Sequence, residues 1–138
     1  MIAYVDSSVL LRVVLGEPGR LPSWQSIETG VCSALVEVEC LRTLDRLRHQ
    51  GALSLEDVAT RRATVFELLE GVELVAVTRP VLRRAADPFP TPLGTLDAIH
   101  LATALQWADY RSRQPVLATH DGELALAARA CGLKVIGV

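Results

Sequence analysis

The stretch Gly94–Trp107, GTLDAIHLATALQW, decides the fold because it has only one sensible local structure. It is rich in Ala and Leu, and Thr95 offers a hydroxyl where a helix N-cap is expected, so it predicts a helix. Apolar residues occupy nearly every side of this helix, which indicates burial. Asp97 lies in its first turn, where a lone carboxylate is costly unless it is paired, hydrogen-bonded or metal-bound. The helix N-terminus offers one compensation, and convergence with other acids around a cation offers another.

The composition predicts one domain, residues 1–138, with a well-supplied core, because half of the residues are hydrophobic. No apolar run is long enough to span a bilayer, so we expect a cytoplasmic protein that does not contact a membrane. Three cysteines without a CxxC pair suggest buried thiols in a reducing compartment. A net charge of −2 gives no global basic field for nucleic acid. Only one lysine is present, so nearly all positive charge is arginine, which suits phosphate and carboxylate partners.

Strand and helix patterns alternate along the chain on both sides of this stretch. Continuous apolar strands between helices predict an α/β fold, with a parallel sheet covered on both faces. The expected strands are Met1–Val5, Val31–Ser33, Val72–Val77, Val116–Thr119 and Val135–Val138. The expected helices are Val9–Leu15, Ser23–Thr29, Ala34–Gln50, Ser54–Glu70, Arg79–Ala86, Gly94–Trp107 and Gly122–Cys131. The two long helices, Ala34–Gln50 and Ser54–Glu70, should form a helical hairpin.

Two further acids follow predicted strands. Asp6 comes directly after the first strand and Asp121 after the fourth. Each is also a plausible helix cap. However, ligands of parallel sheets bind outside the carboxyl ends of the strands, so Asp6, Asp121 and Asp97 are predicted to meet there.

Clustered carboxylates repel one another and take up protons unless a cation holds them. Oxygen ligands of this kind select Mg²⁺, with Mn²⁺ as a possible substitute. Such ions activate water and stabilise the charge that develops in phosphoryl transfer, so no histidine or lysine is needed as a base. The acids therefore predict metal-dependent phosphodiester chemistry.

The sequence resembles the PIN-domain ribonucleases, and within them the VapC-type toxins of toxin–antitoxin pairs. The resemblance covers the whole chain and is carried by YVDSSVLLRV, SALVEVECLRTL, TLDAIHLATAL and VLATHDGELALAARACGLKVIGV. It implies a PIN-like three-layer α/β/α sandwich with a central parallel sheet of about five strands and a protruding helical hairpin. It also implies a Mg²⁺-dependent endoribonuclease, a cognate antitoxin and a homodimer. The implied acidic site is Asp6, Glu39, Asp97 and Asp121, with Ser7 and Thr119 in support.

The site glutamate is ambiguous from the pattern alone. Helical periodicity places Glu39 on a polar stripe with Arg42 and Arg46, while Glu37 lies nearer the apolar side. The family pattern, with a serine six residues before the acid and an arginine three after it, selects Glu39. We take Asp6, Asp97 and Asp121 as the expected metal ligands, and Glu39 as a fourth ligand or a group that orients water.

Three further side chains are candidates for supporting roles. His100 lies on the same side of its helix as Asp97 and could touch a phosphate or the metal shell, although a hydrogen-bonded core histidine is the commoner case. Arg42 and Arg46 could contact RNA or the antitoxin, or form an ordinary solvated helix face. Apolar residues of the hairpin suggest a surface for an antitoxin helix; they include Val58, Val65, Phe66 and Leu69.

Three other functions are alternatives to this one. A catalytically silent PIN module would bind RNA or a partner without cutting, although the acid set is complete. A signalling receiver domain has a similar architecture, but it needs paired acids after its first strand, where this chain has Asp6-Ser7-Ser8. A haloacid-dehalogenase phosphatase would need an acid at Ser8.

Overall fold

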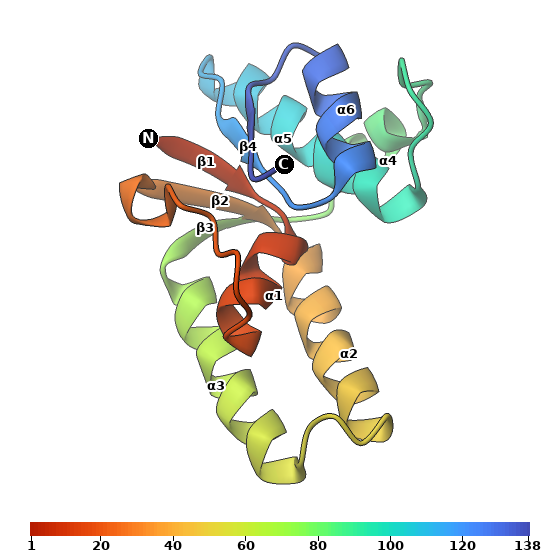
Figure 1. The fold of residues 1–138 in the computed structure, drawn as a ribbon. Coiled ribbons are helices and arrows are strands. Elements are labelled where there is room, and N and C mark those ends of the chain that lie inside the picture. Colours follow the sequence, from red (N-terminus) through yellow and green to blue (C-terminus); the bar gives the residue numbers. More distant parts are fainter.

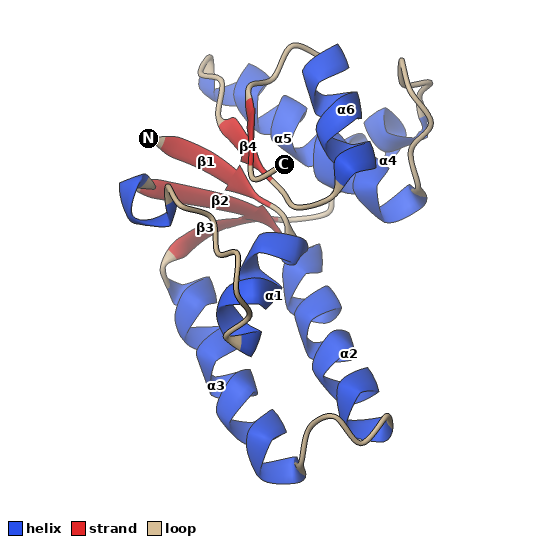
Figure 2. Ribbon diagram, viewed as in Figure 1, coloured by secondary structure: helices blue, strands red, loops and turns tan.

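A computed structural model describes residues 1–138 as a five-stranded sheet between two layers of helices (Figures 1 and 2). All neighbouring strands are parallel, in the order β3-β2-β1-β4-β5. The strands are β1 (Ile2–Val5), β2 (Thr29–Ser33), β3 (Val72–Val75), β4 (Val116–Ala118) and β5 (Val135–Ile136). The helices are α1 (Ser7–Leu15), α2 (Leu35–His49), α3 (Leu55–Glu70), α4 (Arg79–Ala86), α5 (Thr95–Arg111) and α6 (Gly122–Ala130). The predicted α/β/α architecture is confirmed.

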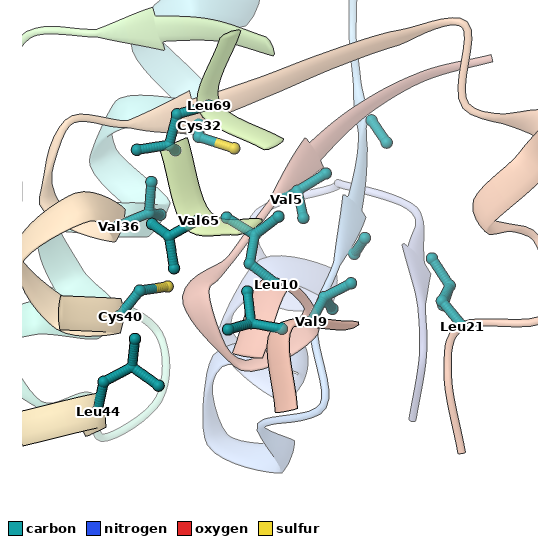
Figure 3. Close-up of a cluster of buried hydrophobic side chains, with 13 residues drawn as sticks. Val5, Val9, Leu10, Leu21, Cys32, Val36, Cys40, Leu44, Val65 and Leu69 are labelled. Atoms are coloured by element: carbon teal, nitrogen blue, oxygen red, sulfur yellow. The ribbon is translucent and has the colours of Figure 1, made fainter. Parts of the chain in front are cut away.

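Side chains of β1 alternate between two separate hydrophobic clusters, one on each face of the sheet. Ala3 and Val5 point into a cluster covered by α1, α2 and α3 (Figure 3), whereas Tyr4 points into a second cluster under α5 and α6. Leu44 in the first cluster and Leu101 in the second are completely buried. Because both faces of β1 are buried, its carboxyl end is held between the two helical layers.

The predicted helical hairpin consists of α2 and α3, which extend away from the sheet (Figure 1). Ser54 caps α3 in a reciprocal capping box with Asp57, as the sequence indicated. However, Val65 and Leu69 belong to the first core cluster and are not available on the hairpin surface. Of the four hairpin residues proposed for partner binding, only Phe66 is an exposed large apolar side chain, at 41%.

Two local predictions are wrong. Ser23–Thr29 is not a helix: only Trp24–Ser26 forms a 3-10 turn, because Thr29 already pairs with Ile2 in the sheet. Thr95 does not cap the central helix; Gly94 holds the cap position without a side-chain hydrogen bond, and Thr95 is the first helical residue.

The expectation of buried thiols holds for two of the three cysteines. Cys32 and Cys40 are buried and Cys131 is half-buried, and all three are free. No helix is both long enough and apolar enough to pass through a bilayer.

Candidate active site

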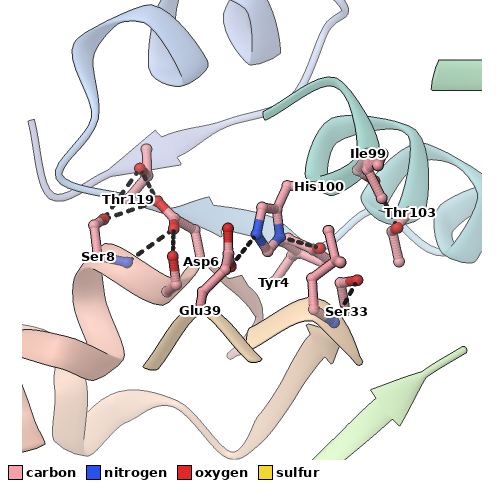
Figure 4. Close-up of polar contacts among 11 residues, drawn as sticks. Tyr4, Asp6, Ser8, Ser33, Glu39, Ile99, His100, Thr103 and Thr119 are labelled. Atoms are coloured by element: carbon pink, nitrogen blue, oxygen red, sulfur yellow. Dashed lines mark hydrogen bonds and ion pairs between the residues drawn. The ribbon is translucent and has the colours of Figure 1, made fainter. Parts of the chain in front are cut away.

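Asp6 lies where β1 ends and α1 begins, and its carboxylate is surrounded by donors (Figure 4). It accepts hydrogen bonds from the Ser8 N–H at 2.8 Å, the Ser8 hydroxyl at 2.8 Å and the Ser7 hydroxyl at 3.1 Å. The Thr119 hydroxyl also donates to it. The side chain thus caps α1 and is only 4% exposed. These donors hold the charge of Asp6 at the end of the central strand.

The loop after β4 is tied to the same place. The Thr119 hydroxyl accepts a hydrogen bond from the Asp121 N–H at 2.9 Å, and the Ser8 hydroxyl accepts one from the His120 N–H at 2.9 Å. Asp121 itself caps α6 by accepting from the Leu124 N–H at 2.9 Å. The ends of β1 and β4 therefore bring Asp6 and Asp121 to one edge of the sheet, as predicted.

Asp97 reaches this edge from the first turn of α5 and makes no hydrogen bond or ion pair within the chain. Partial burial, together with the negative charges of Asp121 and Asp6, raises the pKa of Asp97 to about 6. The charge of Glu39 acts in the same direction, while His100 opposes it. The helix N-terminus alone would favour the ionised form, so the neighbouring carboxylates and desolvation outweigh it.

Glu39 joins the site from α2 through an unexpected contact. Its Oε2 lies 2.7 Å from Nε2 of His100, and Nδ1 of His100 lies 2.9 Å from the Tyr4 hydroxyl (Figure 4). His100 is 1% exposed, so it is a hydrogen-bonded core histidine and cannot touch a phosphate; its only hydrogen bond to a candidate site residue is the one to Glu39. Burial would lower the pKa of His100, but the hydrogen bond and charge of Glu39 raise it above its ordinary value.

Comparisons with known proteins identify the family of the chain. A family model described as PIN domain matches residues 3–130. The chain belongs to the PIN-domain family. Ribonuclease VapC47 of Mycobacterium tuberculosis is 31% identical to it over 136 residues, which cover 94% of this chain and 91% of the relative.

Two solved structures share the PIN fold of the chain. The structure of FitAB bound to the IR36 DNA fragment has a TM-score of 0.72 at 16% identity, covering 98% of this chain and 94% of that one. A toxin–antitoxin complex from Klebsiella pneumoniae has a TM-score of 0.66 at 13% identity, covering 99% and 96%. At these identities the likeness concerns the fold.

The acids of this PIN domain have the oxygen ligands of a hard-cation site, but their side chains are not grouped as they would be around a bound ion. All four candidates offer carboxylate oxygens, which suit Mg²⁺. No three His, Cys, Asp or Glu side chains are arranged as a metal-binding group, and Asp6 is turned towards its hydroxyl donors. Burial, followed by the charges of Asp121 and Asp6, raises the pKa of Asp97, as expected where carboxylates lie near one another.

The sequence-predicted supporting residues separate into two groups. Ser7 and Thr119 contact Asp6 directly, whereas Arg42 and Arg46 line an outer groove of about 350 Å³ beside Glu39. Sequence reasoning missed the supporting contacts of Ser8, although its hydroxyl two residues after the strand-end acid was a usable signal. It also missed the contact of Tyr4, for which no local signal exists.

Proposed function

We propose that this PIN domain is a Mg²⁺-dependent endoribonuclease that acts as the toxin of a toxin–antitoxin pair. The observation that carries the proposal is the meeting of four acids from separate elements at the carboxyl edge of the sheet, marked by the pKa of Asp97 at about 6. Its relative VapC47 bears the name ribonuclease. PIN domains of the VapC type generally depend on a divalent metal.

In this proposal, Asp6, Asp97 and Asp121 hold the ion, and Glu39 holds it or orients the attacking water. When bound, Mg²⁺ would polarise the scissile phosphate and activate water. Hydrogen bonds from Thr119 and the serine hydroxyls fix the position of the Asp6 side chain at the end of β1. Asp97 must release its proton before it can act as a ligand, and the positive charge of the ion favours that release.

The reaction gives distinctive products. Because water is the nucleophile, the cut should leave a 5′-phosphate and a 3′-hydroxyl. A mechanism through the ribose 2′-hydroxyl would instead leave a cyclic phosphate. The target is expected to be single-stranded or looped RNA.

Activity measurements on the full chain test the proposal. Purified protein should cleave a mixed RNA substrate with Mg²⁺ or Mn²⁺, stop in excess EDTA, and produce ends that a ligase requiring 5′-phosphate accepts. Asp6→Asn and Asp97→Asn should abolish cleavage while circular dichroism shows a retained fold. Glu37→Gln is the matched control, because this neighbouring acid on α2 lies outside the cluster, and its cleavage rate should equal that of the wild type.

Each alternative function has its own signature in these experiments. Cleavage that persists in EDTA, or normal cleavage by Asp97→Asn, would refute the assigned site. RNA binding without cleavage at any metal concentration would identify a silent binding module. Labelling by an acyl phosphate would identify a receiver domain.

The outer surface of the hairpin suits an antitoxin helix. A hollow of about 420 Å³ between α2 and α3 is lined by Val38, Leu41, Arg42, Asp45, Val58 and Arg62. It shares Val38 and Arg42 with the groove that leads to Glu39. Val38 is 59% exposed and so offers apolar surface to a partner. An amphipathic helix laid in this groove would cover the apolar residues, and a basic side chain at its end could enter the acidic pocket.

Partner binding and self-association are tested in solution. Co-expression with the product of the neighbouring gene should give a complex on size-exclusion chromatography, and Val38→Asp should weaken it without reducing cleavage by the free chain. The chain alone is proposed to elute as a homodimer. Normal complex formation by Val38→Asp would place the antitoxin on another surface.

A further inference from the structure

A buried chain of hydrogen bonds ends on the candidate catalytic glutamate. The Tyr4 hydroxyl is 2.9 Å from His100 Nδ1, and His100 Nε2 is 2.7 Å from Glu39 Oε2. Tyr4 and His100 are 0% and 1% exposed, whereas the Glu39 side chain retains 16% exposure. The chain of contacts thus runs from the sealed interior to the edge of the acidic pocket (Figure 4).

The hydrogen bond to Glu39 has the same direction in both charge states of the imidazole, whereas the bond to Tyr4 reverses. If His100 is neutral, the Tyr4 hydroxyl donates to Nδ1 and the Nε2–H donates to Glu39. If His100 is protonated, both nitrogens donate, and the Tyr4 oxygen accepts. In either case Oε2 of Glu39 accepts an N–H. Its other oxygen is left for the site.

The three residues come from three elements that also carry the candidate acids. Tyr4 lies two residues before Asp6 in β1, and His100 lies one helical turn after Asp97 in α5. Glu39 lies on α2, where helical periodicity alone would leave it on a polar, solvated stripe. The two hydrogen bonds therefore tie the glutamate of α2 to the strand and helix that position the aspartates.

We propose that Tyr4 and His100 are positioning residues that hold Glu39 in its working orientation through this relay. The inference rests on the proposed nuclease function and deepens it. Groups that hydrogen-bond to a ligating or water-orienting side chain fix its direction, and their loss typically reduces activity about 10- to 100-fold. Neither residue contacts the substrate, so their removal should act on turnover and leave substrate binding intact.

Paired substitutions separate positioning from a merely structural role. His100→Leu removes both hydrogen bonds and should lower kcat about 10- to 100-fold with little change in KM. His100→Gln supplies an acceptor and a donor and should restore most of that kcat. Leu101→Val, which trims the next residue of the same buried helix, is the control for loss of packing and should leave kcat unchanged.

Nuclear magnetic resonance gives a readout that does not depend on activity. The wild-type protein should show one imidazole Nε2 proton protected from solvent exchange, and assignment by its loss in His100→Gln should identify His100. Glu39→Ala should abolish that protection, and Tyr4→Phe should shift the Nδ1 resonance of the same ring. These spectra remain informative even if His100→Leu does not fold.

Specific outcomes would overturn the inference. Wild-type kcat in a folded His100→Leu variant, equal loss in His100→Leu and His100→Gln, or an unprotected His100 proton would each do so. By contrast, the absence of RNA cleavage by the wild-type chain with a protected His100 proton would refute the proposed nuclease and leave the hydrogen-bond relay standing.

Discussion

Asp97→Asn is expected to stabilise the metal-free protein at pH 8 and to have little effect at pH 4. Burial and the charges of Asp121 and Asp6 raise the pKa of Asp97 from 3.8 to about 6. Below the lower value the carboxyl is neutral in both the folded and the unfolded chain. Above the higher value it is charged in both, and the folded state carries the full cost of that charge. Stability is therefore lost as the pH rises from about 4 to about 6.

The size of this effect follows from the difference between the two pKa values of Asp97. About two pH units correspond to about 3 kcal/mol of unfolding free energy. Because the carboxylate is partly exposed, solvent screening reduces the expected gain to about 1–2 kcal/mol. For a chain of this length each kcal/mol changes the melting temperature by about 3–4 °C. Asp97→Asn should thus melt about 3–8 °C above the wild type at pH 8.

Thermal unfolding at pH 4, 6 and 8 in EDTA measures this dependence, and Mg²⁺ should stabilise the wild type but not Asp97→Asn. Glu123→Gln, a change to an exposed acid in the first turn of α6, is the control and should give no pH-dependent gain. Asp57→Asn should lower stability at pH 8, because hydrogen bonds with Ser54 hold the pKa of Asp57 below its ordinary value. An equal gain for Asp97→Asn at pH 4 and 8, or destabilisation at pH 8, would refute the electrostatic reasoning.

Three further predictions concern packing and thiol reactivity. Gly137→Ala should unfold or strongly destabilise the chain and stop cleavage, because its Cβ would lie 2.3 Å from the Thr119 carbonyl oxygen. The control Gly132→Ala would place its Cβ in open space and should lower the free energy of unfolding by only about 1–2 kcal/mol in chemical denaturation. Leu44→Ala should cost about 2–5 kcal/mol in the same assay, since Leu44 is fully buried on α2. With a thiol reagent at pH 8, Cys131 should react first, because burial raises the pKa of Cys32 and Cys40 to about 12. Early labelling of Cys32 or Cys40 would contradict this prediction.

The part of the site that follows from strand ends could be predicted from sequence. Asp6 comes directly after β1 and Asp121 three residues after the end of β4, and parallel strands bring their carboxyl ends to one edge of the sheet. Asp97 could be predicted because a charged residue in a wholly apolar helix requires a compensating partner. In each case the residues next to the acid in the sequence indicate the element that carries it and the edge of the sheet where it lies.

Local capping was less predictable because several residues compete for the same role. Thr95 has the preferred side chain for an N-cap, yet Gly94 takes the position. A helix boundary shifts by one residue at small cost, whereas pairing in the sheet is cooperative. That difference also explains why Thr29 entered β2 when its surroundings suggested a short helix.

Glu39 shows where sequence periodicity stops being informative. A helical wheel describes whether a side chain faces the helix's own apolar side, and by that measure Glu39 is a surface acid. A helical wheel does not show which residues of another element pack against the polar side of the helix. Glu39 contacts His100, which lies 61 residues further along the chain, and His100 contacts Tyr4, which lies 96 residues before it. A polar stripe can therefore be solvated along most of α2 and still end against the candidate site. The family motif selects Glu39, and the contact of Glu39 with His100 is a tertiary one that no local pattern contains.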